Sequence, residues 1–316
     1  MIPMLQDKVN PKKVPLSKRL NPILRNWELY VMFSFVLAYF IIYHYWPMYG
    51  VQIGFRKFNG VDGILGSQWR GFYYFELFIN SAYFFQTVSN TFLLSVYQLS
   101  LSFPAQIILA LMMNELRSKA LKKTVQTVTY APHFISMVVM CSMVTLFLSP
   151  TTGVINKAIE ALGGKAIYFL AEPKYFKTIY VLSGVWQSTG WGSIIYMATL
   201  AGIDPQIHEA AIIDGASRLQ RIWHVNIPGI LPTAVILLIM SCGSIMSVGF
   251  EKVYLLMNDR NLEAAEIIST YTYKRGLIDQ NYSLSTAVGL MNSVVNMILL
   301  VTVNTISRKV GESSLW

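Results

Sequence analysis

The residues with the clearest chemical signal lie between Asp204 and Pro232, in the segment D-P-Q-I-H-E-A-A-I-I-D-G-A-S-R-L-Q-R-I-W-H-V-N-I-P-G-I-L-P. Asp204 is a good N-cap, and Pro205 fits the first position of a helix, where its missing N–H costs nothing. Asp214-Gly215 is a turn signal, because glycine tolerates positive φ and aspartate can bond its own backbone. The segment therefore predicts a short helix that begins after Asp204 and ends near Ile213.

A second short helix should follow the turn. Ser217, with Gln220 three residues later, has the spacing of a capping box, and we expect Pro228 to end this helix. The acids Glu209 and Asp214 can accept hydrogen bonds from basic groups, and three small side chains allow a close fit to a partner: Ala210, Ala211 and Ala216. These features favour a docking surface over an active site, although an ordinary amphipathic surface loop would share several of them.

Signals for catalysis are absent from the sequence. Its histidines are scattered, at positions 44, 133, 208 and 224, and there is no H-E-x-x-H and no G-x-x-x-x-G-K-[ST]. The two cysteines, Cys141 and Cys242, fall inside apolar stretches, where a thiol acts as a small hydrophobe. The sequence therefore predicts no catalytic residue, no metal site and no cofactor bound by this chain.

Polar residues inside the apolar stretches recur at helical spacing. One stripe consists of Thr91, Ser95, Gln98, Ser102 and Gln106, and a ridge of small residues consists of Gly184, Ser188 and Gly192. Such stripes either hold helices together or line a path for a polar solute, and amide and aromatic side chains suit a neutral, hydroxyl-rich one. The candidate pathway residues are Gln98, Trp186, Gln187, Trp191, Gly243, Ser244, Asn292 and Asn296.

The elements that position these residues are predicted to be transmembrane helices. The chain has 316 residues, of which 54% are hydrophobic and 13% charged, whereas soluble domains carry about 25% charged residues. Six charge-free windows exceed the roughly 20 residues that a span needs. We therefore expect an all-α integral membrane protein with six spans, at approximately 29–47, 84–113, 124–148, 178–202, 231–253 and 285–307.

The basic residues indicate how these spans are oriented. The net charge is +9, but more than half of the 25 Lys and Arg residues lie before span one, between spans two and three, between four and five, and after six. These segments are the shorter part of the chain, so the positive-inside rule places them, both termini and a loop at 204–230 in the cytosol. We expect residues 1–28 to form a basic N-terminal arm, followed by a single transmembrane domain, 29–316. No nucleic-acid surface is expected, because the segment 204–232 is tethered at both ends and holds two basic against three acidic residues.

Several motifs resemble one family. E-A-A-x-x-D-G-A followed by I-P-x-x-x-P resembles the EAA loop of binding-protein-dependent ABC importer permeases. F-E-K-V-Y-L-L-M-N, from Phe250, and Y-S-L-S-T-A-V-G-L, from Tyr282, resemble the carbohydrate-uptake subgroup. The terminal I-S-R-K-V-G-E-S-S-L-W and the segment G-F-R-K-F-N-G are similar to lipoprotein-linked polysaccharide or complex-sugar permeases. The chain lacks the extra N-terminal helices and the large outer domain of maltose-type permeases, whose core it otherwise resembles.

The resemblance implies a type I importer permease in a bacterial cell membrane, with a cytosolic coupling helix between spans four and five. That helix would contain Glu209, Ala210, Ala211, Asp214, Gly215 and Ala216, with Pro228 at its end. The implied partners are a second homologous permease, two ATPase subunits that bind ATP and Mg²⁺, and an extracytoplasmic solute-binding lipoprotein. The implied substrate is a sugar, oligosaccharide or polysaccharide fragment. A permease for another solute and a membrane enzyme are the alternatives, and both are disfavoured because the six charge-free windows contain no charged side chain.

Overall fold

The computed structural model describes residues 26–310 and 314–315, and the chain divides into two compact units, 1–52 and 53–316. The described part of the first unit is a continuous helical segment. It consists of α2 (Trp27–Phe40), the π-helical turn η1 (Ile41–Tyr45) and α3 (Trp46–Met48), and it runs on into the 3₁₀ helix η2 (Tyr49–Phe55).

The helix of the first unit is apolar on every face. No side chain of α2, η1 or α3 is buried, and large apolar residues such as Phe35 and Trp46 are among the most exposed of the described chain. A helix that is hydrophobic all round must be covered by lipid or by another protein. The basic arm predicted at 1–28 lies outside the described residues as far as residue 25.

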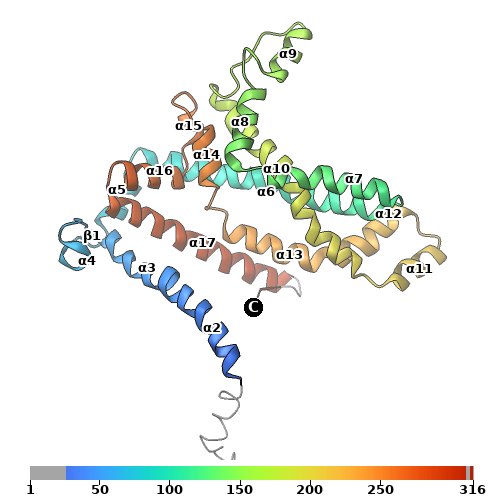
Figure 1. Cartoon of the computed structure of the whole chain (residues 1–316), viewed down its shortest axis with the longest axis horizontal. Coiled ribbons are helices and arrows are strands. Elements are labelled where there is room, and N and C mark those ends of the chain that lie inside the picture. Colours follow the sequence, from blue (N-terminus) through green and yellow to red (C-terminus); the bar gives the residue numbers. More distant parts are fainter. Residues whose placement is uncertain (1–25, 311–313, 316) are drawn as a thin grey trace, which may run out of the picture. The chain divides into compact units, whose positions relative to one another are not determined.

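The second unit begins with a short ribbon, in which β1 (Arg56–Lys57) pairs antiparallel with β2 (Gln68–Trp69) around α4 (Gly63–Gly66). The rest is helical, and Figure 1 shows α7 running beside α10 and α13 beside α17, in agreement with their contacts. The further elements are α5 (Tyr73–Ile79), α6 (Tyr83–Glu115), α7 (Lys119–Tyr130), η3 (Ala131–Phe134), α8 (Met137–Phe147), α9 (Val154–Ala161), α10 (Pro173–Ala201), α11 (Pro205–Ile213), α12 (Arg218–Arg221), η4 (Ile222–Asn226), α13 (Ile227–Gly243), α14 (Phe250–Leu256), α15 (Leu262–Ala265), α16 (Ile268–Tyr273), η5 (Lys274–Ile278) and α17 (Tyr282–Val310).

Helices long and apolar enough to cross a membrane are present in both units. Within the described residues, length and composition select four: Trp27–Phe55, Tyr83–Glu115, Arg218–Gly243 and Tyr282–Lys309. A fifth is added if the bent pair Lys119–Phe134 and Met137–Phe147 is one span. The 29-residue α10 packs along α6 but is not in this set. The chain is thus mostly helical and multi-spanning, and the number six stays a prediction.

The segment expected as one span at 124–148 is two helices joined at an angle of 101°. Pro132 lies in the 3₁₀ turn η3, and Ile135 and Ser136 are extended, with the Ser136 side chain capping α8 by accepting a hydrogen bond from Val139 N. Hydropathy records only that this stretch is apolar, so it cannot reveal the bend.

The segment expected at 231–253 is interrupted as well. Helix α13 ends at Gly243, residues 244–249 are not helical, and α14 begins at Phe250. The Asn296 side chain on α17 holds the interruption: its Oδ1 accepts a hydrogen bond from Met246 N (3.0 Å), and its Nδ2 donates to Ser247 Oγ (2.9 Å). The non-helical backbone is therefore tied to a neighbouring helix, as a break at membrane depth requires.

Candidate functional site

The loop that carries the E-A-A motif folds as its sequence predicts. The Asp204 side chain caps α11 by accepting a hydrogen bond from Gln206 N (2.9 Å). At the other end, Gly215 has φ +80°, and the bonds Ala216 N to Ala211 O and Gly215 N to Ile212 O form a Schellman motif. Only a glycine adopts this backbone conformation without strain, so the D-G pair fixes where α11 ends.

The second short helix also begins as expected. Ser217 Oγ accepts from Gln220 N, and Gln220 Oε1 accepts from Ser217 N at 2.7 Å, which completes the capping box. Pro228, however, does not end this helix. The π-helical turn η4 follows α12 and leads directly into α13, with Pro228 in the first turn of α13. Because the π turn already interrupts the regular hydrogen-bond ladder, the missing N–H of Pro228 is accommodated.

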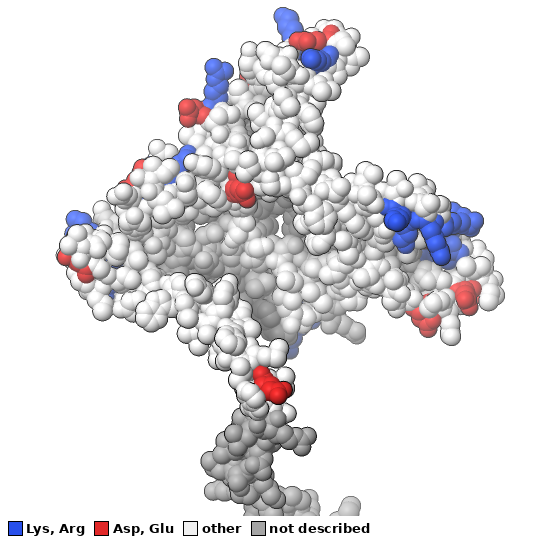
Figure 2. All heavy atoms as spheres, in the orientation of Figure 1, with Lys and Arg blue, Asp and Glu red and all other residues white. Residues whose placement is uncertain are grey.

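The surface of this loop suits a partner that is absent from the structure. Glu209, Ala210, Asp214 and Gly215 are exposed, and Ala211 and Ala216 are half-buried. Large apolar side chains stand beside them, with Ile213 85% and Leu219 70% exposed. Figure 2 shows acidic and basic side chains gathered at the end of the molecule where Figure 1 places α7, α11 and α12. An exposed apolar knob rimmed by charges is typical of a docking surface.

Two of the candidate pathway residues line a common cavity. Gln98 of α6 and Ser244, which follows α13, face a cavity of about 280 Å³ whose polar lining also includes Ser95, Ser102, Tyr180, Ser241 and Ser247. Gln98 Oε1 is buried and has no hydrogen-bond partner. Hydroxyl and amide groups around such a space provide donors and acceptors for a hydroxyl-rich solute. Thr91, at one end of the predicted stripe, is engaged in packing, because its hydroxyl accepts a bond from Ile268 N.

Gln187 and Trp191 support the bend between α7 and α8. Gln187 Nε2 donates to Ile135 O (3.1 Å), a carbonyl that the broken helix leaves without an intrahelical partner. The Trp191 ring stacks on His133, with centroids 4.5 Å apart and an interplanar angle of 4°. Both side chains therefore have a structural role, and a role in the pathway stays a prediction.

The remaining candidates differ in their surroundings. Trp186 is 48% exposed, and Asn292 Oδ1 is buried without a partner. Gly243 lies so close to α17 that an added Cβ would come within 2.5 Å of Leu300 Cδ1, so this glycine serves helix packing. Asn296 is committed to the interruption after α13. The structure thus brings Gln98 and Ser244 together at one cavity, and none of the other candidates lines it.

One buried cation escaped the sequence analysis. Lys252 is 4% exposed, its Nζ donates to Tyr180 O (2.6 Å) and lies 4.4 Å from the centre of the Tyr180 ring. No acidic side chain of the described chain forms an ion pair with it. Gly184 provides the space, since an added Cβ there would lie 2.9 Å from Lys252 Nζ and 2.8 Å from Gln98 Oε1. Lys252 was missed because it directly follows the charge-free window that ends at Glu251.

No cluster of three or more His, Cys, Asp or Glu side chains that could hold a metal ion occurs in the described part of the chain.

Residues 81–312 match the family described as binding-protein-dependent transport system inner membrane component. The chain belongs to this family. It is an inner-membrane permease of the ABC importer type, with several membrane-spanning helices.

Relatives of this permease agree with the family. Protein LplB of Bacillus subtilis (strain 168) is 42% identical over 92% of this chain and 92% of its own. The polygalacturonan/rhamnogalacturonan transport system permease protein YteP of the same organism is 39% identical over 98% of this chain and 97% of its own. Among solved structures, a bacterial alginate ABC transporter in complex with an alginate pentasaccharide-bound periplasmic protein superposes with a TM-score of 0.87, at 38% identity, over 94% of this chain and 99% of that one.

Proposed function

We propose that this permease is one half of the membrane channel of an ATP-driven importer for a saccharide. The main support is the likeness, along nearly the whole chain, to a polygalacturonan/rhamnogalacturonan permease and to a transporter that imports the acidic polysaccharide alginate. The second half would be a homologous permease, and an extracytoplasmic lipoprotein would deliver the sugar. Two ATPase subunits would bind and hydrolyse ATP with Mg²⁺.

The loop 204–230 is the proposed contact with an ATPase subunit. Its exposed apolar residues, Ile213 and Leu219, would enter a cleft, and Glu209 and Asp214 would accept hydrogen bonds from basic groups of the partner. The Schellman motif and the capping box make the loop rigid, so movement of the partner would displace it as one body.

A continuous helix connects this loop with the polar cavity. Residues Arg218–Gly243 form 26 residues of unbroken helix, about 39 Å at the usual rise per residue. Its far end is the interruption 244–249, where Ser244, Ser247 and Gly249 line the cavity that Gln98 also lines. Displacement of the loop would therefore move the cavity wall, and this connection is the proposed route by which ATPase closure opens the pathway.

Purification of the chain from its native membrane in a mild detergent tests this proposal. Co-purifying polypeptides are identified, and ATP hydrolysis is assayed with and without candidate receptors and sugars. We expect a second permease, an ATPase, and turnover that one receptor with its sugar increases. A chain that purifies alone and without ATPase activity would contradict the importer, and stimulation by a receptor for a non-sugar solute would contradict the proposed substrate.

A further inference from the structure

A second pocket lies far along the chain from the coupling loop, between α8, the segment before α10 and the segment after α14. Its volume is about 560 Å³, within the roughly 300–1,000 Å³ of small-molecule sites. It is lined by Thr145, Leu148, Ser149, Pro150, Tyr168, Phe169, Leu170, Ala171, Asn258, Asp259 and Arg260. The predicted topology, with the loop 204–230 in the cytosol and both α10 and α13 crossing the membrane, puts this pocket on the outer side.

The walls of this pocket are braced by buried amides. Asn156 is 1% exposed, and its Nδ2 donates to the carbonyls of Leu148, Ser149 and Ile167, while its Oδ1 accepts from Ile167 N at 2.8 Å. One side chain thus fixes the end of α8 against the segment that carries Tyr168.

The side-chain amides of Asn258 and Asn261 fix the segment after α14 against the segment before α10. Leu170 O accepts from Asn258 Nδ2 (2.9 Å) and from Asn261 Nδ2 (2.8 Å), and Asn261 is fully buried. Asn258 Oδ1 also accepts from Arg260 N (3.0 Å). An open surface loop has no need of such bracing, whereas a binding site gains affinity when its walls are fixed beforehand.

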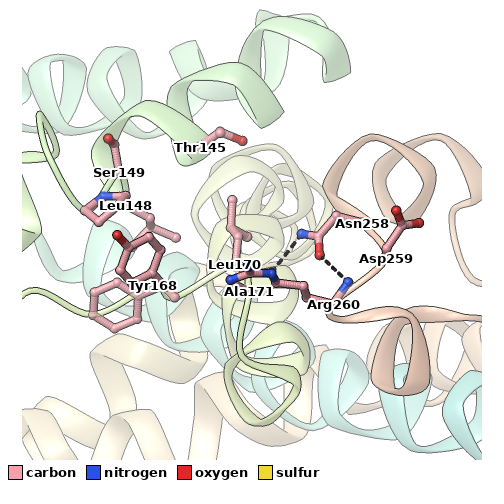
Figure 3. A pocket seen from close by; sticks show the side chains of 11 residues that line it. Thr145, Leu148, Ser149, Tyr168, Leu170, Ala171, Asn258, Asp259 and Arg260 are labelled. Carbon is pink, nitrogen blue, oxygen red and sulfur yellow. Dashed lines mark hydrogen bonds between the residues drawn. The ribbon is translucent and has the colours of Figure 1, made fainter.

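The pocket is lined by one acidic and one basic side chain, Asp259 and Arg260, and their directions differ. Figure 3 shows the Arg260 side chain extending toward Leu170 and Ala171, on the side where Tyr168 lies, whereas the carboxylate of Asp259 points away from them. Arg260 forms no ion pair within residues 26–310. A guanidinium offers two parallel donors that match a carboxylate, and a ring such as Tyr168, which is 59% exposed, can cover the apolar face of a sugar.

We propose that this pocket is an outer subsite for an acidic saccharide, in which Arg260 binds a uronate carboxylate and Tyr168 packs on the sugar ring. The inference rests on the proposed function, because it assumes a saccharide importer with this pocket outside. It adds a point of contact before the membrane cavity and a preference for carboxylated over neutral sugar units.

Binding of short saccharides to the assembled importer, without its receptor, tests the subsite. The importer is placed in lipid nanodiscs, and trisaccharides of galacturonate, glucuronate and mannuronate are titrated by saturation-transfer difference NMR beside their methyl esters. We expect at least one acid to bind about tenfold or more tightly than its ester. Equal binding of acid and ester for all three would overturn the proposal.

Variants assign the binding to this pocket. Arg260→Ala should weaken the acid about tenfold or more and leave the ester unchanged, Arg260→Lys should restore part of the difference, and Tyr168→Ala should weaken both ligands. Lys157→Ala is the matched control, since Lys157 is an exposed cation on α9 that does not line the pocket, and it should change nothing. An unchanged acid affinity in Arg260→Ala would overturn the proposal.

The same preparations separate this inference from the proposed function and from a receptor contact. If the receptor stimulates ATP hydrolysis in the wild type but acids bind no more tightly than their esters, the subsite proposal is wrong and the importer proposal still holds. If Arg260→Ala instead weakened the binding of the empty receptor and left the trisaccharides unaffected, the pocket would be a receptor contact and the subsite proposal would be wrong.

Discussion

Glu209 is an exposed acid in the middle of α11, a helix of nine residues that packs little of its own surface. Its side chain makes no ion pair within the described chain, so removing its charge should not disturb the fold. Its proposed role depends entirely on a partner. Substitution at this position can therefore separate the coupling of ATP hydrolysis from the stability of the permease.

Glu209→Lys should place a cation where the ATPase is expected to present basic groups. We expect receptor-stimulated ATP hydrolysis to fall about tenfold or more, since a charge-assisted contact is lost and replaced by repulsion, while the permease still assembles in the membrane. Glu160→Lys, an equally exposed acid on α9, is the matched control. Normal stimulation in Glu209→Lys would count against the assignment of the coupling helix.

Lys252 is a buried cation without an ion-pair partner in the described chain. Burying an unpaired charge lowers the free energy of unfolding. Lys252→Met keeps the length and apolar stem of the side chain, so we expect its midpoint of thermal unfolding in detergent to equal or exceed that of the wild type. Lys252→Ala leaves a cavity and should destabilise the protein by roughly 2 kcal/mol or more. If Lys252→Met were as unstable as Lys252→Ala, the hydrogen bond to Tyr180 O would be essential to the fold.

At the scale of elements, the sequence predicts helix caps, which depend on neighbouring residues. It does not predict helix breaks that depend on contacts with residues far away in the chain. Asp204, Gly215, Ser217 and Gln220 make the caps that their sequence predicts, because each cap involves residues within a few positions of one another. The bend at Ala131–Ser136 could not be predicted from hydropathy. It depends on Gln187, more than 50 residues away, which satisfies the carbonyl that the bend exposes.

Among the candidate site residues, too, the sequence predicts some surroundings and misses others. Spacing alone placed Gln98 on a polar stripe, and in the structure this residue lines a polar cavity with Ser244, while its role in a pathway stays a prediction. Spacing could not show that Asn296 holds the break after Gly243, because the contact joins α17 to a loop about 50 residues earlier in the chain. Arg260 and Tyr168 had no sequence signal, since they come from separate loops.

A close helix approach lies at Gly190, beside the predicted ridge of Gly184, Ser188 and Gly192, whose two glycines face Gln98 and Gln106 of α6. A Cβ at Gly190 would lie 2.0 Å from Thr129 O and 2.4 Å from Thr129 C, which are backbone atoms of α7. Gly190→Ala must therefore separate α10 from α7. We expect this variant to lose about 1–3 kcal/mol of stability, measured as a lower midpoint of thermal unfolding of the purified complex.

Gly184→Ala is the matched control for this prediction. An added Cβ there would meet only the ends of two flexible side chains, Gln98 and Lys252, which can move aside. We expect a loss below about 1 kcal/mol. Equal stability of the two variants would show that α7 and α10 can separate freely, and that the close approach is not a determinant of the fold.

At the scale of the whole molecule, the distribution of charge predicts which end faces the cytosol. Arg117, Lys119 and Lys123 are exposed, in α7 or just before it. Figure 2 shows basic side chains gathered at the end where Figure 1 places α7 and α12, and short basic segments are retained on the cytosolic side during insertion. The proposed roles of the coupling loop and of the outer pocket both require this orientation.

Single cysteines and a maleimide that does not cross membranes measure the orientation directly. In a background with Cys141→Ala and Cys242→Ala, we expect Asp259→Cys and Asp62→Cys to be labelled in intact cells, and Lys119→Cys only after the membrane is permeabilised. All three positions are exposed, so poor access to the side chain cannot imitate protection by the membrane. Labelling of Lys119→Cys in intact cells, with protection of Asp259→Cys, would place the E-A-A loop outside, where no ATPase could reach it.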